Sequence, residues 1–318
     1  MSDFAWVDRR IHIRKTDIKI PLDRHLVAEV VQWLLYFAVL GVAAGAARLT
    51  RRRPLAIWFT PDRPPPWYLI RGAALWAGIG AARTEAEADA AFYFEDATSG
   101  SPPQPTHAAS HNFACSNVSK SHVAAVFEEV FGYPLTVDPL AVTGPIVEKS
   151  EKNGVHDGRI VEAPAPARQG YAYQRLVDTA DEAGVCRDFR TPCVGGSPVV
   201  VWIKHKPGGG RFAIHNRRVT LREPSEVFSQ AELAQIRRFT ARMGLDWGGL
   251  DILRDRHDGR IYIVDVNKTD LGPVIALSWF DKIRSMRRLG DALERLIAQP
   301  QGVADRPSAV QEQASHAG

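Results

Sequence analysis

An acid and an amide end an apolar segment near the carboxyl end of the chain, in "GRIYIVDVNKTDLGP" at 259–273. Successive side chains of a strand point to opposite faces. One face should therefore carry Ile261, Ile263, Asp265 and Asn267. A carboxylate in such a covered place is costly unless something pairs with it. Two interpretations are open at this point: a turn that simply ends the strand, or a site where the charge has a partner.

A second acid, Asp251, lies one predicted strand earlier, in "WGGLDIL". A hairpin that turns at 255–259, where "HDG" favours a turn, would make Asp251 a near neighbour of Asp265. Two acids in a covered site repel each other, and a magnesium ion relieves that repulsion. Magnesium binds a few protein oxygens together with phosphate oxygens and water, which two carboxylates and the amide of Asn267 can provide.

A lysine and a glycine-bearing turn come earlier in the chain. Lys149 ends the segment "GPIVEKS", and the turn "EKNGVHDG" that follows contains Gly154 and Gly158. Backbone N–H groups of such a turn can lie over phosphates, and the lysine can place a charge on them. The alternative is a solvated lysine beside a hairpin.

Two further strands carry polar residues. In "YQRLVD", Arg175 to Val177 can offer the backbone donor and acceptor that an adenine needs, although any strand offers the same groups. In "RDFR", Asp188 and Arg190 share a face. This pair is either a surface salt bridge of little energetic worth, or an arginine held by an acid so that it faces phosphate.

The composition indicates a globular protein in a reducing compartment. The 318 residues are 45% hydrophobic and 24% charged, and the net charge is only +4. No aromatic-plus-basic motif indicates nucleic acid as a partner. The three cysteines lack the CxxC spacing of a zinc site and form no disulfide scaffold.

Residues 30–47 are almost wholly apolar, and arginines follow at 48 and 51–53. This apolar run, within a predicted helix over 26–47, is at the lower length limit for a membrane span. The helix is either inserted in or lying on a membrane, or buried against the protein. Its basic flanks fit an anchor on the cytoplasmic side, but because both flanks are basic they do not decide an orientation.

The remaining pattern predicts an α+β protein. We expect a basic amino-terminal segment with the apolar helix over 1–53, a small α/β unit over 54–116, a larger unit over 117–298 and a disordered tail over 299–318. Strands are predicted at "PLAIWFT", "AAFYFED", "GPIVEKS", "RIVEAP", "AYQRLVD", "DFRTPCV", "PVVVWIKHK", "GGLDILRD" and "RIYIVDVN". Helices are predicted at "WYLIRGAALWAGIG", at "SNVSKSHVAAVFEEVFGY" with its end at Gly132, over 228–243 and over 279–297.

The order of these motifs resembles the ATP-grasp superfamily, especially the branch of ribosomal-protein glutamate ligases and glutathione synthetases. The matching segments, over about 117–297, are "IVEKS", "YQRLV", "DFR", "RFAIHN", "LDIL" and "VDVN". The resemblance implies an ATP-grasp fold, in which two α+β subdomains hold ATP, preceded by a truncated α/β domain.

The resemblance also implies roles for individual residues. It assigns nucleotide binding to Lys120, Lys149, Gln174, Arg175, Leu176, Val177 and Asp178. Magnesium, or manganese in its place, falls to Asp251, Asp265 and Asn267, and the reacting phosphoryl group to Arg190, Lys204 and Asn216. Three features depart from the family: Asp265 stands where Glu is more common, the turn after Lys149 has few glycines, and "KTDLGP" replaces a run of small residues and proline.

These observations favour a cytoplasmic ATP-dependent carboxylate–amine ligase that forms an acyl phosphate and releases ADP. Its partners would be small-molecule or peptide substrates, with a carboxylate on one and an amine on the other. The alternatives are a phosphotransferase on the same fold and a membrane-tethered nucleotide-binding protein without turnover.

Overall fold

The structure is a computed structural model that describes residues 4–7, 10–13, 18–21, 23–50, 53–155, 157–207 and 218–298. Two expectations lie outside the described residues. They are the role of Asn216 and the disordered tail over 299–318.

The largest sheet contains the predicted acids. Its strand order is β14-β13-β11-β15-β16, every pair is antiparallel, and the short β12 pairs with β11. The strands are β11 (Val185–Val194), β12 (Ser197–Pro198), β13 (Val201–Pro207), β14 (Arg218–Arg222), β15 (Trp247–Arg254) and β16 (Ile261–Asn267). One face of this sheet packs against α3 (Lys120–Phe131) and α5 (Gln230–Met243) in a single apolar core. The short helix α4 (Pro224–Val227) precedes α5.

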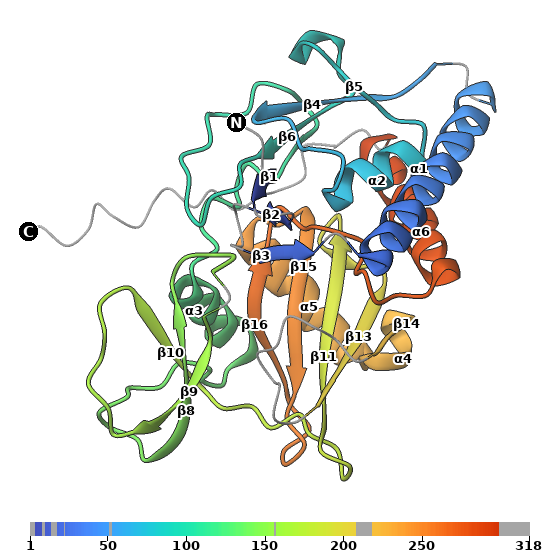
Figure 1. Ribbon diagram of the computed structural model, residues 1–318. Helices are drawn as coiled ribbons and strands as arrows, with labels where there is room; N and C mark the ends of the chain where they lie inside the picture. The colour runs from blue at the N-terminus through green and yellow to red at the C-terminus, as the bar shows by residue number, and fades with distance from the viewer. Residues whose placement is uncertain are drawn as a thin grey trace, which may run out of the picture.

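A smaller sheet stands beside the β16 edge of the large one (Figure 1). Its order is β10-β8-β9, also antiparallel, with β8 (Gly144–Ser150), β9 (Arg159–Ala163) and β10 (Tyr171–Arg175). The helix α3 begins with Ser119 as its cap and ends at Gly132, as the sequence predicts. Two antiparallel sheets with helices on the outside thus face each other across a space that their polar residues share.

A β-bulge interrupts the predicted alternation of side chains between the two faces of β16. Asp265 lies opposite Asp251, but Ile263 lies opposite Ile252, so Val264 is an extra residue on this strand. The prediction that Ile263 shares a face with Asp265 is therefore wrong. A bulge changes the direction in which the following side chains point, and here it turns Asp265 away from the apolar core that holds Ile263.

The small α/β unit is present. Its sheet has the order β5-β4-β6-β7 with all strands parallel, as expected of the truncated domain. Its elements are β4 (Ala56–Pro61), α2 (Leu69–Trp76), β5 (Gly80–Ala81), the 3-10 helix η1 (Glu85–Glu87), β6 (Ala90–Phe94) and β7 (Ser110–His111). One hydrophobic core joins this unit to α1 (Arg24–Thr50), to α6 (Trp279–Ala298) and to the near end of the large sheet.

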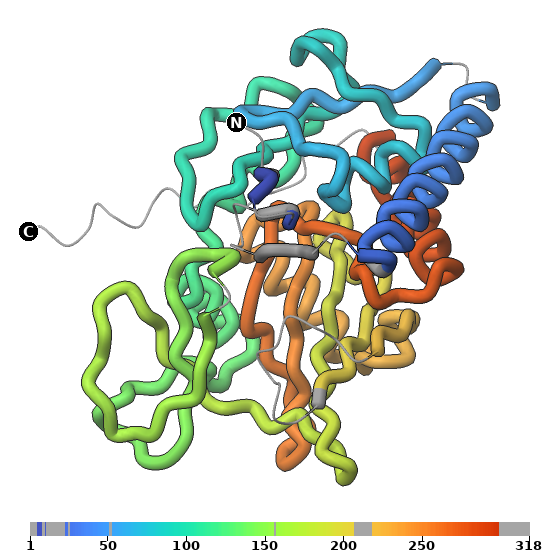
Figure 2. The backbone as a smooth tube through the Cα atoms, viewed as in Figure 1, coloured from blue at the N-terminus to red at the C-terminus, as the bar shows by residue number. Residues whose placement is uncertain are grey.

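The amino-terminal segment has structure that the sequence did not predict. Three strands, β1 (Phe4–Val7), β2 (Arg10–Ile13) and β3 (Ile18–Pro21), form an antiparallel sheet before α1. Residues 10–13 and 18–21 do alternate polar and apolar side chains, but each run is only four residues long. After them, α1 runs along the periphery of the molecule (Figure 2).

A polar junction ties the small unit to the large sheet. The side chain of Asn112 accepts hydrogen bonds from the backbone N–H groups of Asp246 and Trp247, at 2.9 and 2.8 Å, and donates to the carbonyl of Trp247 at 2.8 Å. Beside it, Gly244 ends α5 in the left-handed conformation and lies against Ala114.

We predict that Gly244→Ala lowers the free energy of unfolding more than Gly132→Ala does. Both glycines end a helix at positive φ, which costs a side chain about 1 kcal/mol. A Cβ at Gly244 would also lie 2.5 Å from that of Ala114, whereas nothing lies within 4 Å of one at Gly132. We expect an additional cost of about 1–3 kcal/mol, measured by urea denaturation. Equal losses for the two variants would contradict the close junction.

Candidate active site

A cavity of about 440 Å³ lies between the two antiparallel sheets. We call it the inter-sheet cavity. Its lining includes all but one of the predicted site residues that the structure describes: Lys120, Lys149, Gln174, Arg175, Leu176, Val177, Arg190, Lys204, Asp251, Asp265 and Asn267. Residues from seven different helices and strands thus converge on one space, although they are spread over nearly 150 positions of sequence.

The predicted hairpin brings the two acids together. Asp251 on β15 and Asp265 on β16 are direct cross-strand partners, and Asn267 pairs with Gly249 two residues further along. Cross-strand partners point to the same face, so both carboxylates and the amide face the inter-sheet cavity. The prediction that Asp251 and Asp265 are near neighbours is confirmed.

Arg190 lies at the centre of this arrangement and is buried. Its guanidinium donates to Asp251 at 2.9 Å and to Asp270 at 2.5 Å. With its amide in the orientation that satisfies its neighbours, the oxygen of Asn267 accepts from the same guanidinium at 2.7 Å. The acid expected to hold Arg190, Asp188, does not contact it but pairs with Lys206 at 2.8 Å.

Charge compensation sets the pKa of this cluster. Burial alone would lower the pKa of Arg190, but Asp251 and Asp270 outweigh it and raise that pKa. Burial alone would raise the pKa of Asp251, but Arg190 and Lys204 outweigh it and hold that pKa below the usual range. Lys204 donates to Asp251 at 3.2 Å. Both charged forms are therefore stable in this position.

Asp270 belongs to the cluster but escaped the sequence analysis. It is buried, and burial raises the pKa of its carboxyl, with Arg190 opposing the shift. Its Oδ2 atom has no hydrogen-bond partner among the described residues. That oxygen lies over Gly249, where a Cβ would collide with it and with Nε of Arg190. The second glycine of "WGGLDIL" thus makes room for the contact between Asp270 and Arg190.

Two lysines reach the cavity from the opposite side. Lys120 is the first residue of α3, and its ammonium donates to Asp265 at 2.5 Å. Lys149 on β8 donates to the side-chain oxygen of Gln174 at 3.1 Å. Burial lowers the pKa of Lys149, and Lys120 adds to this, while Asp265 opposes it. A nearby anion such as phosphate would stabilise the charged form of this desolvated ammonium group.

The turn after Lys149 folds over the same space. The side-chain oxygen of its Asn153 accepts from Lys120 at 3.2 Å. Gly154, at φ +79°, has open space where a Cβ would be. Asn153 was not among the predicted site residues, although an Asn between a lysine and a glycine is the available signal.

The far part of β10 forms the other end of the cavity. Gln174 to Val177 line it together with the apolar side chains of Val147, Leu253 and Val264. Asp178 does not belong to this lining. It points to the β15–β16 hairpin and pairs with Arg256 at 3.1 Å and His257 at 3.3 Å. A direct role for the Asp178 side chain in nucleotide binding therefore has no geometric support.

The donor set fits a magnesium ion. The described residues contain no group of three or more His, Cys, Asp and Glu side chains suited to a metal. The cluster instead offers two carboxylates and one amide, which together with phosphate oxygens and water satisfy a hard cation. The same carboxylates are now compensated by Arg190, Lys204 and Lys120, so the protein's own cations balance their charge.

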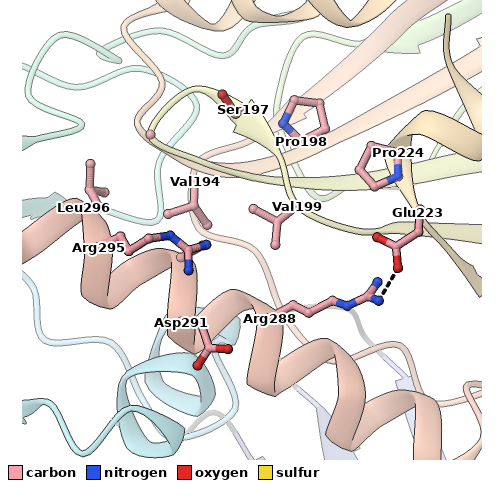
Figure 3. A pocket seen from close by; sticks show the side chains of 12 residues that line it. Val194, Ser197, Pro198, Val199, Glu223, Pro224, Arg288, Asp291, Arg295 and Leu296 are labelled. Atoms are coloured by element: carbon pink, nitrogen blue, oxygen red, sulfur yellow. Dashed lines mark ion pairs between the residues drawn. The ribbon is translucent and has the colours of Figure 1, made fainter. Parts of the chain in front are cut away.

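A second cavity of about 590 Å³ lies on another part of the surface, between α6 and the segment around β12 (Figure 3). It contains none of the predicted site residues. Arg288 and Glu223 face each other there as an ion pair, and both are partly solvated. We therefore assign the chemistry to the smaller inter-sheet cavity.

No protein-family model and no curated protein matches the sequence. Solved structures do match. The ATP-grasp ligase PsnB, complexed with a minimal precursor, Mg and ADP, superposes with a TM-score of 0.50 at 15% identity, over 79% of this chain and 100% of PsnB. A RimK-domain ATP-grasp protein from Sphaerobacter thermophilus DSM 20745 matches with a TM-score of 0.46 at 13% identity, over 77% of this chain and 100% of that protein.

At this identity the likeness to PsnB concerns the fold alone. This likeness, together with the two facing antiparallel sheets and the parallel sheet before them, identifies the fold. The chain has the ATP-grasp fold, as the order of sequence motifs predicts, with a small α/β unit and an amino-terminal apolar helix in front. The partition of the chain into units at 53, 116 and 298 stays a prediction.

We predict that Lys149→Ala weakens ATP binding by about tenfold to a hundredfold, the usual worth of one charge-assisted hydrogen bond. The protein should stay folded, because among the described residues the lysine's side chain donates a hydrogen bond to Gln174 alone. Titration with a fluorescent ATP analogue measures the effect, and Lys149→Arg, which keeps the charge, is the matched control. Unchanged affinity in a folded Lys149→Ala protein would remove the phosphate-contact role.

We predict that Asp270→Asn lowers the rate of phosphoryl transfer by about tenfold or more, with a smaller change in ATP affinity. The variant keeps the size of the side chain but halves the charge that compensates Arg190. Gly249→Ala should act in the same direction without changing any charge, because its Cβ displaces Asp270. Single-turnover kinetics separates the rate from binding. If both variants kept the wild-type rate, Asp270 would have no part in positioning Arg190.

Proposed function

We propose that this protein is an ATP-dependent carboxylate–amine ligase that forms an acyl phosphate and releases ADP. One observation carries the proposal: paired acids of the large sheet face a lysine of α3 and a lysine of the small sheet across a single cavity. Asp251 and Asp265 supply the acids, and Lys120 and Lys149 the cations. A triphosphate that enters between them would pair with the lysines directly and with the acids through magnesium.

The lysines and the turn hold the phosphates in this proposal. Seven basic residues line the inter-sheet cavity: Lys120, Lys149, Lys152, Arg175, Arg190, Lys204 and Lys206. The backbone N–H groups of Gly154 and Val155, in the turn after Lys149, would add donors that carry no formal charge. The adenine would lie at the apolar end, against Leu176 and Val177.

Asp251, Asp265 and Asn267 would hold magnesium, and manganese would accept the same oxygen donors. The ion supplies neutralisation of the charge that develops on the transferred phosphoryl group. Binding of the nucleotide would free Lys120 from Asp265, because the ammonium can then pair with a phosphate oxygen. The ion pairs within the cavity would thus exchange for contacts with the substrate.

Arg190 would stabilise the transition state. Its guanidinium is fixed by Asp251 and Asp270, so little conformational entropy remains to be lost during the reaction. A carboxylate oxygen of the substrate would attack the γ-phosphorus, the bond to the β-phosphate oxygen would break, and ADP would leave. The amine would then attack the acyl carbon and displace phosphate. Lys204 would stabilise charge on the transferred group.

The relatives of this fold support the class of substrate only broadly. PsnB was solved with a minimal precursor, Mg and ADP, and in another structure with a precursor peptide. We infer that a peptide or a small molecule supplies the carboxylate and the amine here. The three cysteines are free and buried, which fits a reducing compartment such as the cytoplasm where ATP is available.

The reaction class is tested by trapping the acyl phosphate. We expect the full chain, given ATP, magnesium, hydroxylamine and a pool of carboxylates, to form a hydroxamate and ADP. AMP as product would overturn the acyl-phosphate mechanism. A stable phosphorylated product without any amine requirement would favour the phosphotransferase instead.

The same assay tests the acid of β16. We predict that Asp265→Asn still binds ATP but transfers the phosphoryl group slower by about a hundredfold or more, since a lost metal ligand removes charge compensation that matters most in the transition state. Asp188→Asn is the control, because Asp188 lines the same cavity but pairs with Lys206. Wild-type turnover of Asp265→Asn would return Asp265 to the role of a strand-end residue.

A further inference from the structure

The helix α1 has two apolar faces, and only one of them is used inside the molecule. Tyr36, Leu40 and Ala44, spaced four residues apart, are buried against α2 and α6. The hydroxyl of Tyr36 lies close to Gly72 of α2, where a larger residue would not fit. This face belongs to the hydrophobic core of the small unit.

The opposite face is exposed. Its large apolar residues, between 37% and 89% exposed, recur every three or four positions: Val27, Val30, Val31, Leu34, Leu35, Val39, Val42 and Leu49. At helical spacing they cover about half of the circumference. The one acidic residue within the helix, Glu29, lies towards the packed side, where it interacts with Lys282 of α6.

No described element covers this face, and α1 lies at the periphery with α2 and α6 on its inner side (Figures 1 and 2). Length and composition alone would also suit a core helix or a signal sequence. A core helix is mostly buried, however, and only 17% of the apolar stretch of α1 is. A signal sequence would not contribute Tyr36 and Leu40 to the core of the mature fold.

We propose that α1 lies in the plane of an anionic membrane surface, with its exposed face in the boundary between headgroups and acyl chains. The distribution of charged residues along α1 favours a membrane surface as the partner of this face. The exposed face carries no charged side chain between Arg24 and Arg48, while the sequence places arginines at both ends of the helix, with three more at 51–53. Apolar side chains between basic ends match acyl chains below a layer of phosphate groups.

The packing favours a helix that lies on the membrane over one that spans it. At 27 residues α1 is long enough to cross a bilayer, so length does not decide. Its middle is fixed to the folded protein through Tyr36 and Leu40, and Arg48 donates to the carbonyl of Gly78 at 3.2 Å near its end. A spanning helix would have to leave this core and expose its inner face, whereas an in-plane helix buries only the face that is now solvated.

Vesicle flotation of the full chain tests the proposal. We expect binding to vesicles of phosphatidylcholine mixed with phosphatidylglycerol, and weaker binding to phosphatidylcholine alone. Leu34→Glu with Val42→Glu should lower the bound fraction by about tenfold or more, because each places a carboxylate among acyl chains. Leu140→Glu is the matched control, since Leu140 is equally exposed on another part of the molecule. Circular dichroism and thermal unfolding verify that the variants stay folded.

Site-directed labelling distinguishes the two membrane arrangements. The native cysteines are buried, so a cysteine introduced at Val27 or at Leu49 can be labelled selectively with an environment-sensitive fluorophore. With an in-plane helix, a membrane-impermeant quencher added outside the vesicles reaches both positions equally. Protection of one position alone would overturn the in-plane arrangement.

Absence of vesicle binding by the wild-type chain would overturn the proposal. A second copy of the chain is then the occupant to expect, and light scattering would show a dimer that Leu34→Glu with Val42→Glu dissociates. Retained vesicle binding by that double variant would equally contradict a role for this face. None of these outcomes depends on ligase activity, so the proposed function can fail or stand separately.

Discussion

The burial of one guanidinium constrains the centre of this molecule. Arg190 sits in the middle of the large sheet, where an uncompensated charge would cost several kcal/mol. Its two neighbours, Asp251 from the adjacent strand and Asp270 from beyond the sheet, supply the charges that compensate it in the folded sheet. Gly249 is required for the same reason, since any side chain there would occupy the space of Asp270.

The requirement that a buried charge has a partner of opposite sign also holds in the inter-sheet cavity. Lys120 reaches from α3 to Asp265, and Lys204 reaches from β13 to Asp251, so each acid of the proposed metal site already has a cation. The first pair links α3 to the large sheet, and the second lies within that sheet. Both ion pairs can be replaced when a nucleotide binds with its metal ion. The phosphates can then take the place of the carboxylates as partners of the lysines, and the metal ion can take the place of the lysines as partner of the carboxylates. A site built only from acids would repel itself, and one built only from lysines would lack metal ligands.

Sequence reasoning reached those parts of the site that local patterns encode. Asp265 and Asn267 follow from alternation along one strand, and Asp251 from the hairpin turn between two strands. Asp270 could not be predicted, because its partner lies 80 residues away and nothing local distinguishes it from an acid in a loop. The bulge at Val264 escaped for a related reason, since it is defined by the pairing with β15 and not by the residue itself. The pairing register of the sheet therefore determines which side chains of β16 face the cavity, and the sequence pattern alone does not.

The core of the small unit links the proposed membrane-facing helix to the cavity. Trp202 is the cross-strand partner of Arg190 on β13, and its indole donates to Ser285 of α6 at 3.0 Å. The helix α6 packs on α2, and α2 packs on α1, within one continuous hydrophobic core. Close-packed interiors of this kind move as a unit. The exposed face of α1 therefore has a fixed direction relative to Arg190, so a surface that holds α1 would also set the direction from which substrates reach the inter-sheet cavity.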